Sequence, residues 1–253
     1  MIFKQAEQTP FGMVNIKPFK GIRYSKDKIS DFNLVITPPY DVISDEELDN
    51  YRKSEFNFSH LILPKGGGEK YKEAAEKIKT WIADNVLVQD KEDSIYIYVQ
   101  RYNLNGEQKE RMGFISLLEI EEIGEGILDH EKTMAKPIED RYKMMESTFS
   151  DLGQVFVMYD DRDSVIDEFL EKKKKEKLPD IEFTDNLGIA HKLWRVSDND
   201  VIDKIRQEMK KYQVIIADGH HRNKTRRIFR DKHQDIEGAR YSLCTFVNSF
   251  HGG

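Results

Sequence analysis

The fold is decided by IIADGHHR, residues 215–222, where an apolar run ends at an aspartate. Gly219 then permits a tight turn, and two histidines and Arg222 follow where the next element begins. This order is typical of a strand, a turn and a helix, with the helix expected over about residues 221–230. The carboxyl end of a strand is where α/β proteins usually place a ligand or a catalytic group. The stretch therefore predicts an α/β fold with a site near Asp218.

The same turn has the chemistry of an anion site. Free backbone N–H groups at the start of a helix attract phosphate, and a glycine lets the ligand approach the main chain. Arg222 adds a guanidinium that can bind a phosphate through two hydrogen bonds. Basic residues without any acidic one continue to Arg230. We therefore expect a cationic pocket for an anionic ligand, although a plain turn with satisfied polar side chains is the alternative.

Two further stretches combine ionisable or rigid residues. Residues 129–133 read DHEKT, in which Glu131 is a candidate general base or metal-facing carboxylate. Residues 37–42 read TPPYDV, in which two prolines stiffen a loop that presents Tyr40 as a stacking surface and Asp41 as a carboxylate. Taken alone, each stretch is more often a hydrophilic loop or a structural turn.

The remaining pattern mixes strands with helices. Asn105-Gly106 between two β-rich runs predicts a hairpin. Ser44 and Glu47 have the spacing of a helical capping box. We expect strands at about residues 34–37, 95–99, 113–118, 154–159, 193–196, 213–217 and 241–247. We expect further helices at about residues 44–53, 71–84, 137–145, 165–170 and 198–209. No linker divides the chain, so we interpret residues 1–253 as one domain of the α/β or the α+β class, and we favour α/β with a mixed sheet.

Composition excludes several classes of protein. The 253 residues carry 40 basic and 46 acidic side chains, and this net charge of −6 argues against a general nucleic-acid binder. The single cysteine, Cys244, excludes an intrachain disulfide and a cysteine-built metal site. The apolar runs are too short to span a membrane, and the N-terminus lacks the pattern of a signal peptide. We therefore expect a cytoplasmic protein without a membrane partner; the sequence does not indicate an oligomeric state.

A series of motifs in a fixed order resembles a widespread prokaryotic family catalogued as a domain of unknown function. The resemblance covers nearly the whole chain. The motifs are NIKPF (15–19), GIRY (21–24), PPYDVI (38–43), RMG (111–113), HEKT (130–133), DR (140–141) and ADGHHR (217–222). The DGHHR segment is also similar to that of the archaeal, SerK-like free-serine kinases, which belong with the ParB and sulfiredoxin-like proteins.

This resemblance implies a ParB/sulfiredoxin-like nucleotide-binding fold with additional strands and helices. It implies a kinase that uses ATP or ADP with Mg²⁺ to phosphorylate the hydroxyl of free L-serine, giving O-phosphoserine. By motif, Glu131 would be the general base, and Asp218 would help to hold substrate or metal. The residues implied at the nucleotide phosphates are Gly219, His220, His221 and Arg222. The residues implied to bind or support the substrate are Tyr40, Asp41, His130, Thr133 and Arg141.

Two other functions use some of the same residues. A ParB-like regulatory protein would bind a nucleotide without transferring a phosphoryl group. A metal-dependent hydrolase would hold Zn²⁺ or Mn²⁺, but adjacent histidines at the start of a helix do not readily converge on one ion. Its ligands would be Asp218, His220, His221 and His130. Members of the family usually continue past the last strand with a segment that includes a His-Arg pair. We therefore expect this domain to lack that segment, as a short variant, a fragment or an inactive relative.

Overall fold

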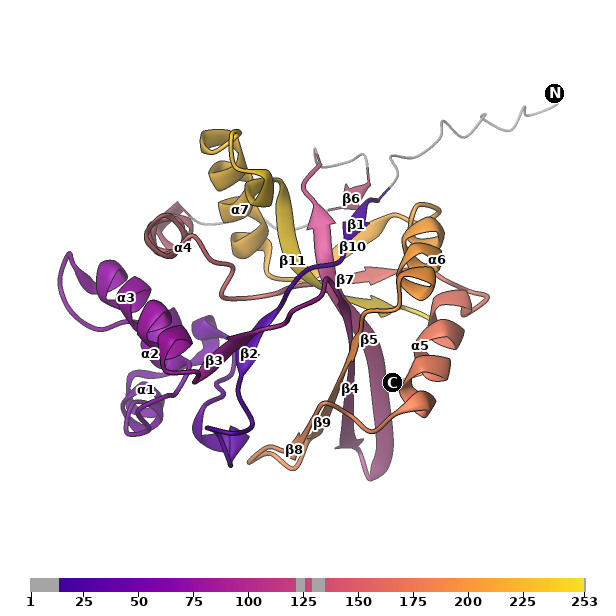
Figure 1. Ribbon diagram of the computed structural model, residues 1–253, viewed down its shortest axis with the longest axis horizontal. Coiled ribbons are helices and arrows are strands. Elements are labelled where there is room, and N and C mark those ends of the chain that lie inside the picture. The colour runs from indigo at the N-terminus through magenta and orange to yellow at the C-terminus, as the bar shows by residue number, and fades with distance from the viewer. Residues whose placement is uncertain (1–13, 122–125, 129–134, 253) are drawn as a thin grey trace.

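The computed structural model describes residues 14–121, 126–128 and 135–252 (Figure 1). Within that part of the chain, nine strands form one mixed sheet in the order β6-β10-β7-β11-β5-β4-β9-β8, with β1 beside β5. The strands are β1 (Ile16–Lys17), β4 (Ile95–Leu104), β5 (Glu107–Glu119), β6 (Ile127–Leu128), β7 (Val155–Tyr159), β8 (Ile181–Thr184), β9 (Ala190–Val196), β10 (Val214–Asp218) and β11 (Tyr241–Asn248). β10 is parallel to β6 and β11 is parallel to β7, whereas the other pairs are antiparallel. The α/β class and the mixed sheet are therefore confirmed.

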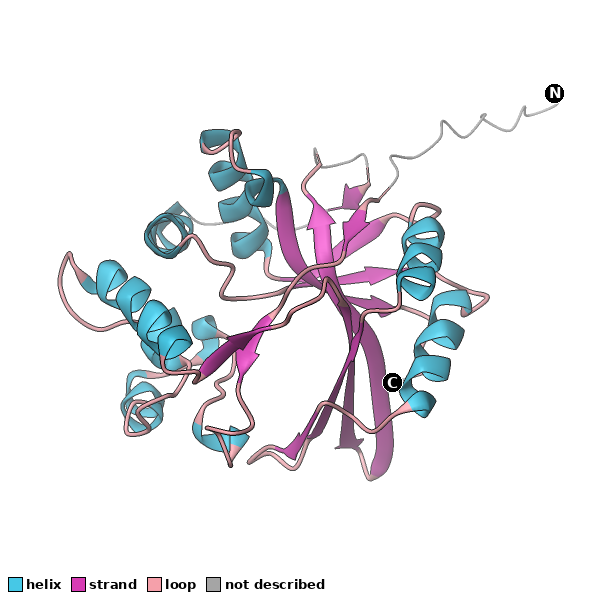
Figure 2. Cartoon of the chain, in the orientation of Figure 1, coloured by secondary structure: helices cyan, strands magenta, loops and turns pink. Residues whose placement is uncertain are grey.

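Helices and a second, two-stranded sheet surround the large sheet (Figure 2). The helices are α1 (Asp45–Tyr51), α2 (Ser59–Ile62), α3 (Lys70–Ala83), α4 (Ala135–Thr148), α5 (Val165–Glu176), α6 (Asn199–Met209) and α7 (His220–Lys232). Short 3-10 turns are η1 (Phe32–Leu34), η2 (Tyr40–Val42) and η3 (Glu237–Arg240). The second sheet pairs β2 (Ile22–Tyr24) with β3 (Leu87–Gln89). In Figure 1, α5 and α6 lie on one side of the large sheet, and the second sheet with α1–α3 lies on the other. No helix in the described ranges has the length and apolarity needed to cross a membrane.

One face of the large sheet forms the main hydrophobic core. Side chains alternate between the two faces of a strand, and Ile97, Phe114 and Phe246 lie opposite one another on three neighbouring strands. The rings of Phe114 and Phe246 stack with their centroids 4.8 Å apart. Ile166 of α5 and Ile205 of α6 are buried in the same cluster. The two helices therefore cover this face, and the opposite face meets the rest of the chain.

That opposite face, here called the open face, carries a different set of side chains. Its members come from four adjacent strands and pair in register across the sheet. They are Tyr98, Gln100, Arg111, Gly113, Phe156, Thr245 and Val247. Guanidinium, amide and hydroxyl groups replace the aliphatic groups of the core face. A ligand that contacts the sheet would therefore bind on the open face.

Residues 22–89, here called the N-terminal lobe, have a hydrophobic cluster of their own. This cluster contains Ile29, Val35, Leu61, Ile78, Trp81, Val86 and Leu87. The predicted amphipathic helix at residues 71–84 is confirmed as α3, which buries Ile78 and Trp81 in the cluster. An ion pair of 2.9 Å between Arg23 and the buried Asp90 ties β2 to the chain that leads into β4. The lobe thus has a small hydrophobic cluster of its own, against which Leu152 from the rest of the chain also packs.

The turn and cap motifs are confirmed. Asn105 and Gly106 both have positive φ angles, 54° and 84°, as the two-residue turn of the β4–β5 hairpin requires. At α1, the Ser44 side chain accepts a hydrogen bond from the Glu47 backbone, and the Glu47 side chain accepts one from Ser44. These motifs were predictable because each depends only on residues close together in the sequence.

The strand predicted at residues 34–37 is wrong. This segment continues from η1 and buries Val35 in the cluster of the N-terminal lobe. Its carbonyl groups bind a loop instead of a neighbouring strand. The Asn57 side chain donates to Leu34 O at 2.9 Å and to Ile36 O at 3.1 Å. The β-branched residues favoured a strand, but the hydrogen-bond partner of this segment is Asn57, in a loop further along the chain.

Candidate functional site

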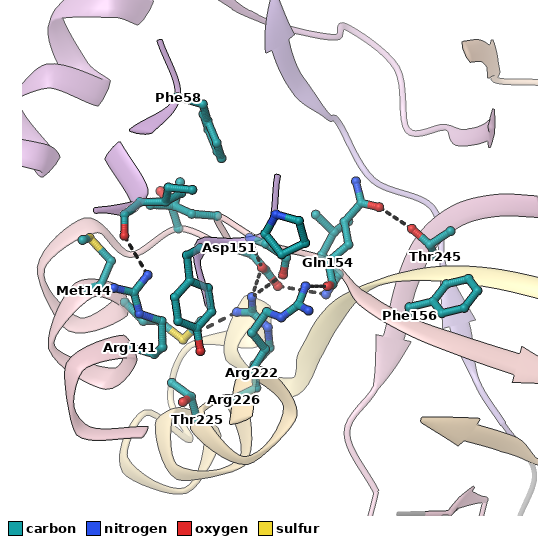
Figure 3. Close-up of a pocket in the computed structure, with 18 of the residues that line it drawn as sticks. Phe58, Arg141, Met144, Asp151, Gln154, Phe156, Arg222, Thr225, Arg226 and Thr245 are labelled. Carbon is teal, nitrogen blue, oxygen red and sulfur yellow. Dashed lines mark hydrogen bonds and ion pairs between the residues drawn. The ribbon is translucent and has the colours of Figure 1, made fainter. Parts of the chain in front are cut away.

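A cavity of about 560 Å³ lies between the open face and the N-terminal lobe (Figure 3). This volume is within the roughly 300–1,000 Å³ of typical small-molecule sites. The lobe contributes Ile22, Thr37, Pro38, Pro39, Tyr40, Phe58 and Ile62. The rest of the lining comes from β4, α4, the segment between α4 and β7, β7, the end of β10, α7 and β11. These residues are Tyr98, Arg141, Met144, Met145, Ser150, Asp151, Leu152, Gly153, Gln154, Phe156, Asp218, Arg222, Thr225, Arg226, Leu243 and Thr245.

The predicted strand, turn and helix form one edge of this cavity. β10 ends at Asp218, and Gly219 caps α7 with a φ of 96°, a conformation that favours glycine. A Cβ atom at Gly219 would lie 3.1 Å from the guanidinium carbon of Arg222. Arg222 donates to the Asp218 carboxylate and to the backbone oxygen of Gln154. The absence of a side chain at Gly219 thus lets the guanidinium fold back over the turn.

A buried ion pair forms the floor of the cavity. Arg226 of α7 is paired with Asp151, and its side chain is only 6% exposed. Asp151 also accepts a hydrogen bond of 2.9 Å from the backbone N–H of Leu243 on β11. Burial lowers the pKa of Arg226 to about 9, which still leaves the guanidinium charged at neutral pH. The pair joins α7, the segment before β7 and the sheet.

Arg141 connects the cavity to the N-terminal lobe. Its guanidinium lies over the ring of Tyr40, 4.3 Å from the centroid, and donates to Ile62 O at 2.7 Å. It also binds the neighbouring Asp140, which accepts a hydrogen bond of 2.6 Å from Tyr71 of α3. Burial opposes ionisation of Asp140, but the bonds from Tyr71 and Arg141 outweigh it and lower the pKa of the carboxyl. Arg141 of α4 is therefore held in place by Tyr40 and Ile62 of the N-terminal lobe and by its neighbour Asp140.

The charges around the cavity are balanced. Each of its three arginines has an aspartate as its partner: Arg141 with Asp140, Arg222 with Asp218, and Arg226 with Asp151. The cationic stretch at the start of α7 therefore does not produce an equally cationic pocket, because Asp218 at the end of β10 pairs with Arg222 and Asp151 from the segment before β7 pairs with Arg226. An anion that binds to one of these arginines has to compete with a carboxylate.

A family model for proteins of unknown function, DUF1015, matches residues 16–253. The chain belongs to the DUF1015 family. Comparisons with curated proteins and with solved structures found no match. The expected membership of a family of unknown function is therefore confirmed, and the family description carries no activity with it.

In this DUF1015 chain, the cavity brings together four of the residues expected from the motifs. They are Tyr40, Arg141, Asp218 and Arg222. Gly219 adjoins the cavity through the cap of α7. His220 is buried, with 4% exposure, His221 is half-buried and Asp41 is exposed, and none of the three lines the cavity. His130, Glu131 and Thr133 lie outside the described residues.

Several residues of the site were not expected from the sequence. They are Phe58, Asp151, Gln154, Phe156 and Thr245. The Thr245 hydroxyl of β11 donates a hydrogen bond to the side-chain oxygen of Gln154, which lies just before the neighbouring parallel strand β7. Polar residues at alternate positions of otherwise apolar strands could have indicated the open face. Nothing in the local sequence connects Asp151 with Arg226, because 75 positions separate them.

Proposed function

We propose that this cavity is the active site of a small-molecule kinase. The reaction transfers a phosphoryl group from ATP or ADP to the hydroxyl of free L-serine and forms O-phosphoserine. The observation that carries the proposal is the convergence of Tyr40, Arg141 and the Asp218–Arg222 turn on one cavity, although they belong to three motifs far apart in the chain. A ParB/sulfiredoxin-like relationship belongs to the same proposal, and the mixed α/β sheet is compatible with it.

The start of α7 is the proposed position of the donor phosphates. The first turn of a helix presents backbone N–H groups and the positive end of the helix dipole. Arg222 lies in this turn and provides a planar, bidentate donor. Because Arg222 is paired with Asp218, a phosphate at this position would displace the carboxylate. Binding of the donor is therefore expected to change the partner of Asp218.

Asp218 is the residue that would hold Mg²⁺ together with the donor. Its side chain is 58% exposed and lines the cavity. Mg²⁺ is usually held by one or two carboxylates, several waters and the phosphates of the substrate, so a single accessible carboxylate fits this role. The ion would supply neutralisation of the phosphate charge, which phosphoryl transfer needs along with accurate positioning.

Acceptance of the proton from the serine hydroxyl is assigned to Glu131. This assignment depends on the HEKT motif, which lies outside the described residues. A carboxylate is the usual proton acceptor when a hydroxyl attacks a phosphoryl group. Replacing it with glutamine removes the basic oxygen while keeping the size of the side chain.

The test is product formation with matched variants. Wild-type protein, Mg²⁺ and serine are incubated with ATP or ADP, and phosphoserine is measured by mass spectrometry. Glu131→Gln should abolish turnover and keep nucleotide binding. Arg222→Met should weaken donor binding roughly 10- to 100-fold, the loss of a charge-assisted hydrogen-bond pair. Lys224→Met, an exposed basic position on the same helix, is the control and should change neither quantity.

One outcome would replace the proposal, and another would change one assignment within it. Tight nucleotide binding by the wild type without any phosphoserine would favour the ParB-like regulatory protein. Normal turnover in Glu131→Gln would remove the assignment of the base.

A further inference from the structure

A second cavity, of about 110 Å³, continues the first one along the open face. The two cavities share Tyr98, Phe156 and Thr245 in their walls. The second cavity is much smaller than the roughly 300 Å³ at the lower end of drug-sized sites, so it suits one functional group and not a nucleotide. Its far wall is formed by Gln100 and Arg111, which lie opposite each other on β4 and β5.

Arg111 differs from the other arginines of the site. Among the residues that the structure describes, no carboxylate lies within ion-pair distance of Arg111, whereas Arg141, Arg222 and Arg226 each have an aspartate. Its Nε and Nη2 atoms both donate to the Gln100 side-chain oxygen, at 3.1 and 2.5 Å. The two N–H donors of Arg111 thus bind a neutral amide oxygen. An oxyanion would bind the same two donors more strongly than the amide does.

The surroundings hold this guanidinium in one orientation. Its central carbon lies 5.4 Å from the ring centroid of Phe156 and 6.0 Å from that of Tyr102. Aromatic faces orient a planar guanidinium and keep water from it, which strengthens its bond to an anion. Phe156 also lines the larger cavity, so the ring beside the guanidinium lies where the two cavities join, and the guanidinium itself lines only the second cavity.

A hydrogen-bonded chain fixes the neighbouring wall. The Tyr98 hydroxyl and His191 Nδ1 are 2.7 Å apart, and His191 Nε2 is 3.1 Å from the Asp185 carboxylate. Burial raises the pKa of Tyr98 to about 12, so the hydroxyl keeps its proton at neutral pH. The cavity wall therefore has a defined shape before any ligand binds.

We propose that Arg111 binds the carboxylate of the acceptor, and that this carboxylate replaces the Gln100 side-chain oxygen as the hydrogen-bond partner of the guanidinium. The acceptor class is a small amino acid, whose carboxylate enters the second cavity while its hydroxyl remains in the first. The position of the hydroxyl in the first cavity rests on the proposed kinase function. Binding of a carboxylate to Arg111 does not require phosphoryl transfer. The alternative oxyanion, a phosphate of the donor, is one outcome of the test.

The test is calorimetric binding of L-serine and of serinamide, which lacks the carboxylate, in the presence of Mg²⁺ and a nucleotide. Wild type should bind serinamide roughly 10- to 100-fold more weakly than serine, as expected for loss of one charged hydrogen-bond pair. Arg111→Met should bind serine more weakly by a similar factor, and its nucleotide affinity should stay within about twofold. Arg111→Lys keeps the charge without the fork and should give an intermediate result. Arg101→Met removes an exposed arginine of β4 outside both cavities and is the matched control.

Each result decides one question. Equal affinity of the wild type for serine and serinamide would overturn the inference, even if Arg111→Met failed to fold. Weakened nucleotide binding with unchanged serine binding in Arg111→Met would assign the site to the donor phosphate and also overturn it. Carboxylate-dependent serine binding without phosphoserine formation would support Arg111 and refute the kinase. Phosphoserine formation with an unchanged KM for serine in Arg111→Met would support the kinase and refute the role of Arg111.

Discussion

Replacing Asp151 with alanine should destabilise the protein more than replacing its partner Arg226 with methionine. The Arg226 side chain is 6% exposed and that of Asp151 is 20% exposed. Without Asp151, the guanidinium keeps a bond of 3.3 Å to Gly153 O and a weak contact with a methionine sulfur. Arginine keeps its proton in proteins at neutral pH, so the guanidinium cannot escape this cost by losing its charge at pH 7. A buried charge left without its partner costs about 3–5 kcal/mol.

Replacing Arg226 instead leaves the Asp151 carboxylate with other hydrogen bonds. In Arg226→Met, Asp151 keeps hydrogen bonds from the backbone N–H groups of Leu243, at 2.9 Å, and Gly153, at 3.3 Å, and it keeps part of its contact with solvent. Methionine also fills much of the volume of the arginine stem. The expected loss is that of one hydrogen bond to a charged group, about 1.5–3 kcal/mol.

Urea unfolding at pH 7 measures both losses and their coupling. The double variant should be more stable than Asp151→Ala alone, because the unpaired guanidinium is gone. If Arg226→Met cost as much as Asp151→Ala, or if the two losses simply added in the double variant, the reasoning about this ion pair would be refuted.

Two further predictions concern stability. Gly113→Ala would place a Cβ atom 2.2 Å from a backbone oxygen of the adjacent strand. The free energy of unfolding of this variant, measured in urea, should therefore fall by about 1–3 kcal/mol or more. Gly238→Ala, with open space around it, is the control, and an equal loss in both variants would contradict the steric argument. Burial raises the pKa of Asp167 in the folded protein. The protonated carboxyl therefore adds to the free energy of unfolding below the ordinary carboxyl pKa, and this contribution is lost as pH rises through the raised pKa of the folded state. Asp167→Asn keeps an oxygen to accept the 2.9 Å bond from Asn248 and should therefore melt higher than wild type at pH 7 but not at acidic pH; parallel melting curves across pH would argue against this.

Local signals in the sequence predicted much of the fold. The Asn105-Gly106 turn, the Ser44 cap and the spacing of apolar residues in α3 each depend on neighbours within one or two turns. The strand, turn and helix around Gly219 were placed correctly for the same reason. These features also located one edge of the candidate site.

The rest of the site depends on contacts between distant segments. Alternation along a strand indicates two faces, but it does not tell which face α5 and α6 will cover. The charge of the α7 stretch was read correctly, whereas its neutralising partner Asp151 comes from another segment. The segment at residues 34–37 has strand-like residues, but its carbonyl groups accept hydrogen bonds from the distant Asn57 side chain instead of from a neighbouring strand.

The most direct test of the central claim is a ³¹P NMR time course of the wild-type protein with Mg²⁺, L-serine and ATP, repeated with ADP. The account predicts that a phosphate-ester signal of O-phosphoserine appears as the terminal phosphate of one donor disappears, in equal amounts. Unchanged donors, or release of inorganic phosphate without any ester signal, would contradict it.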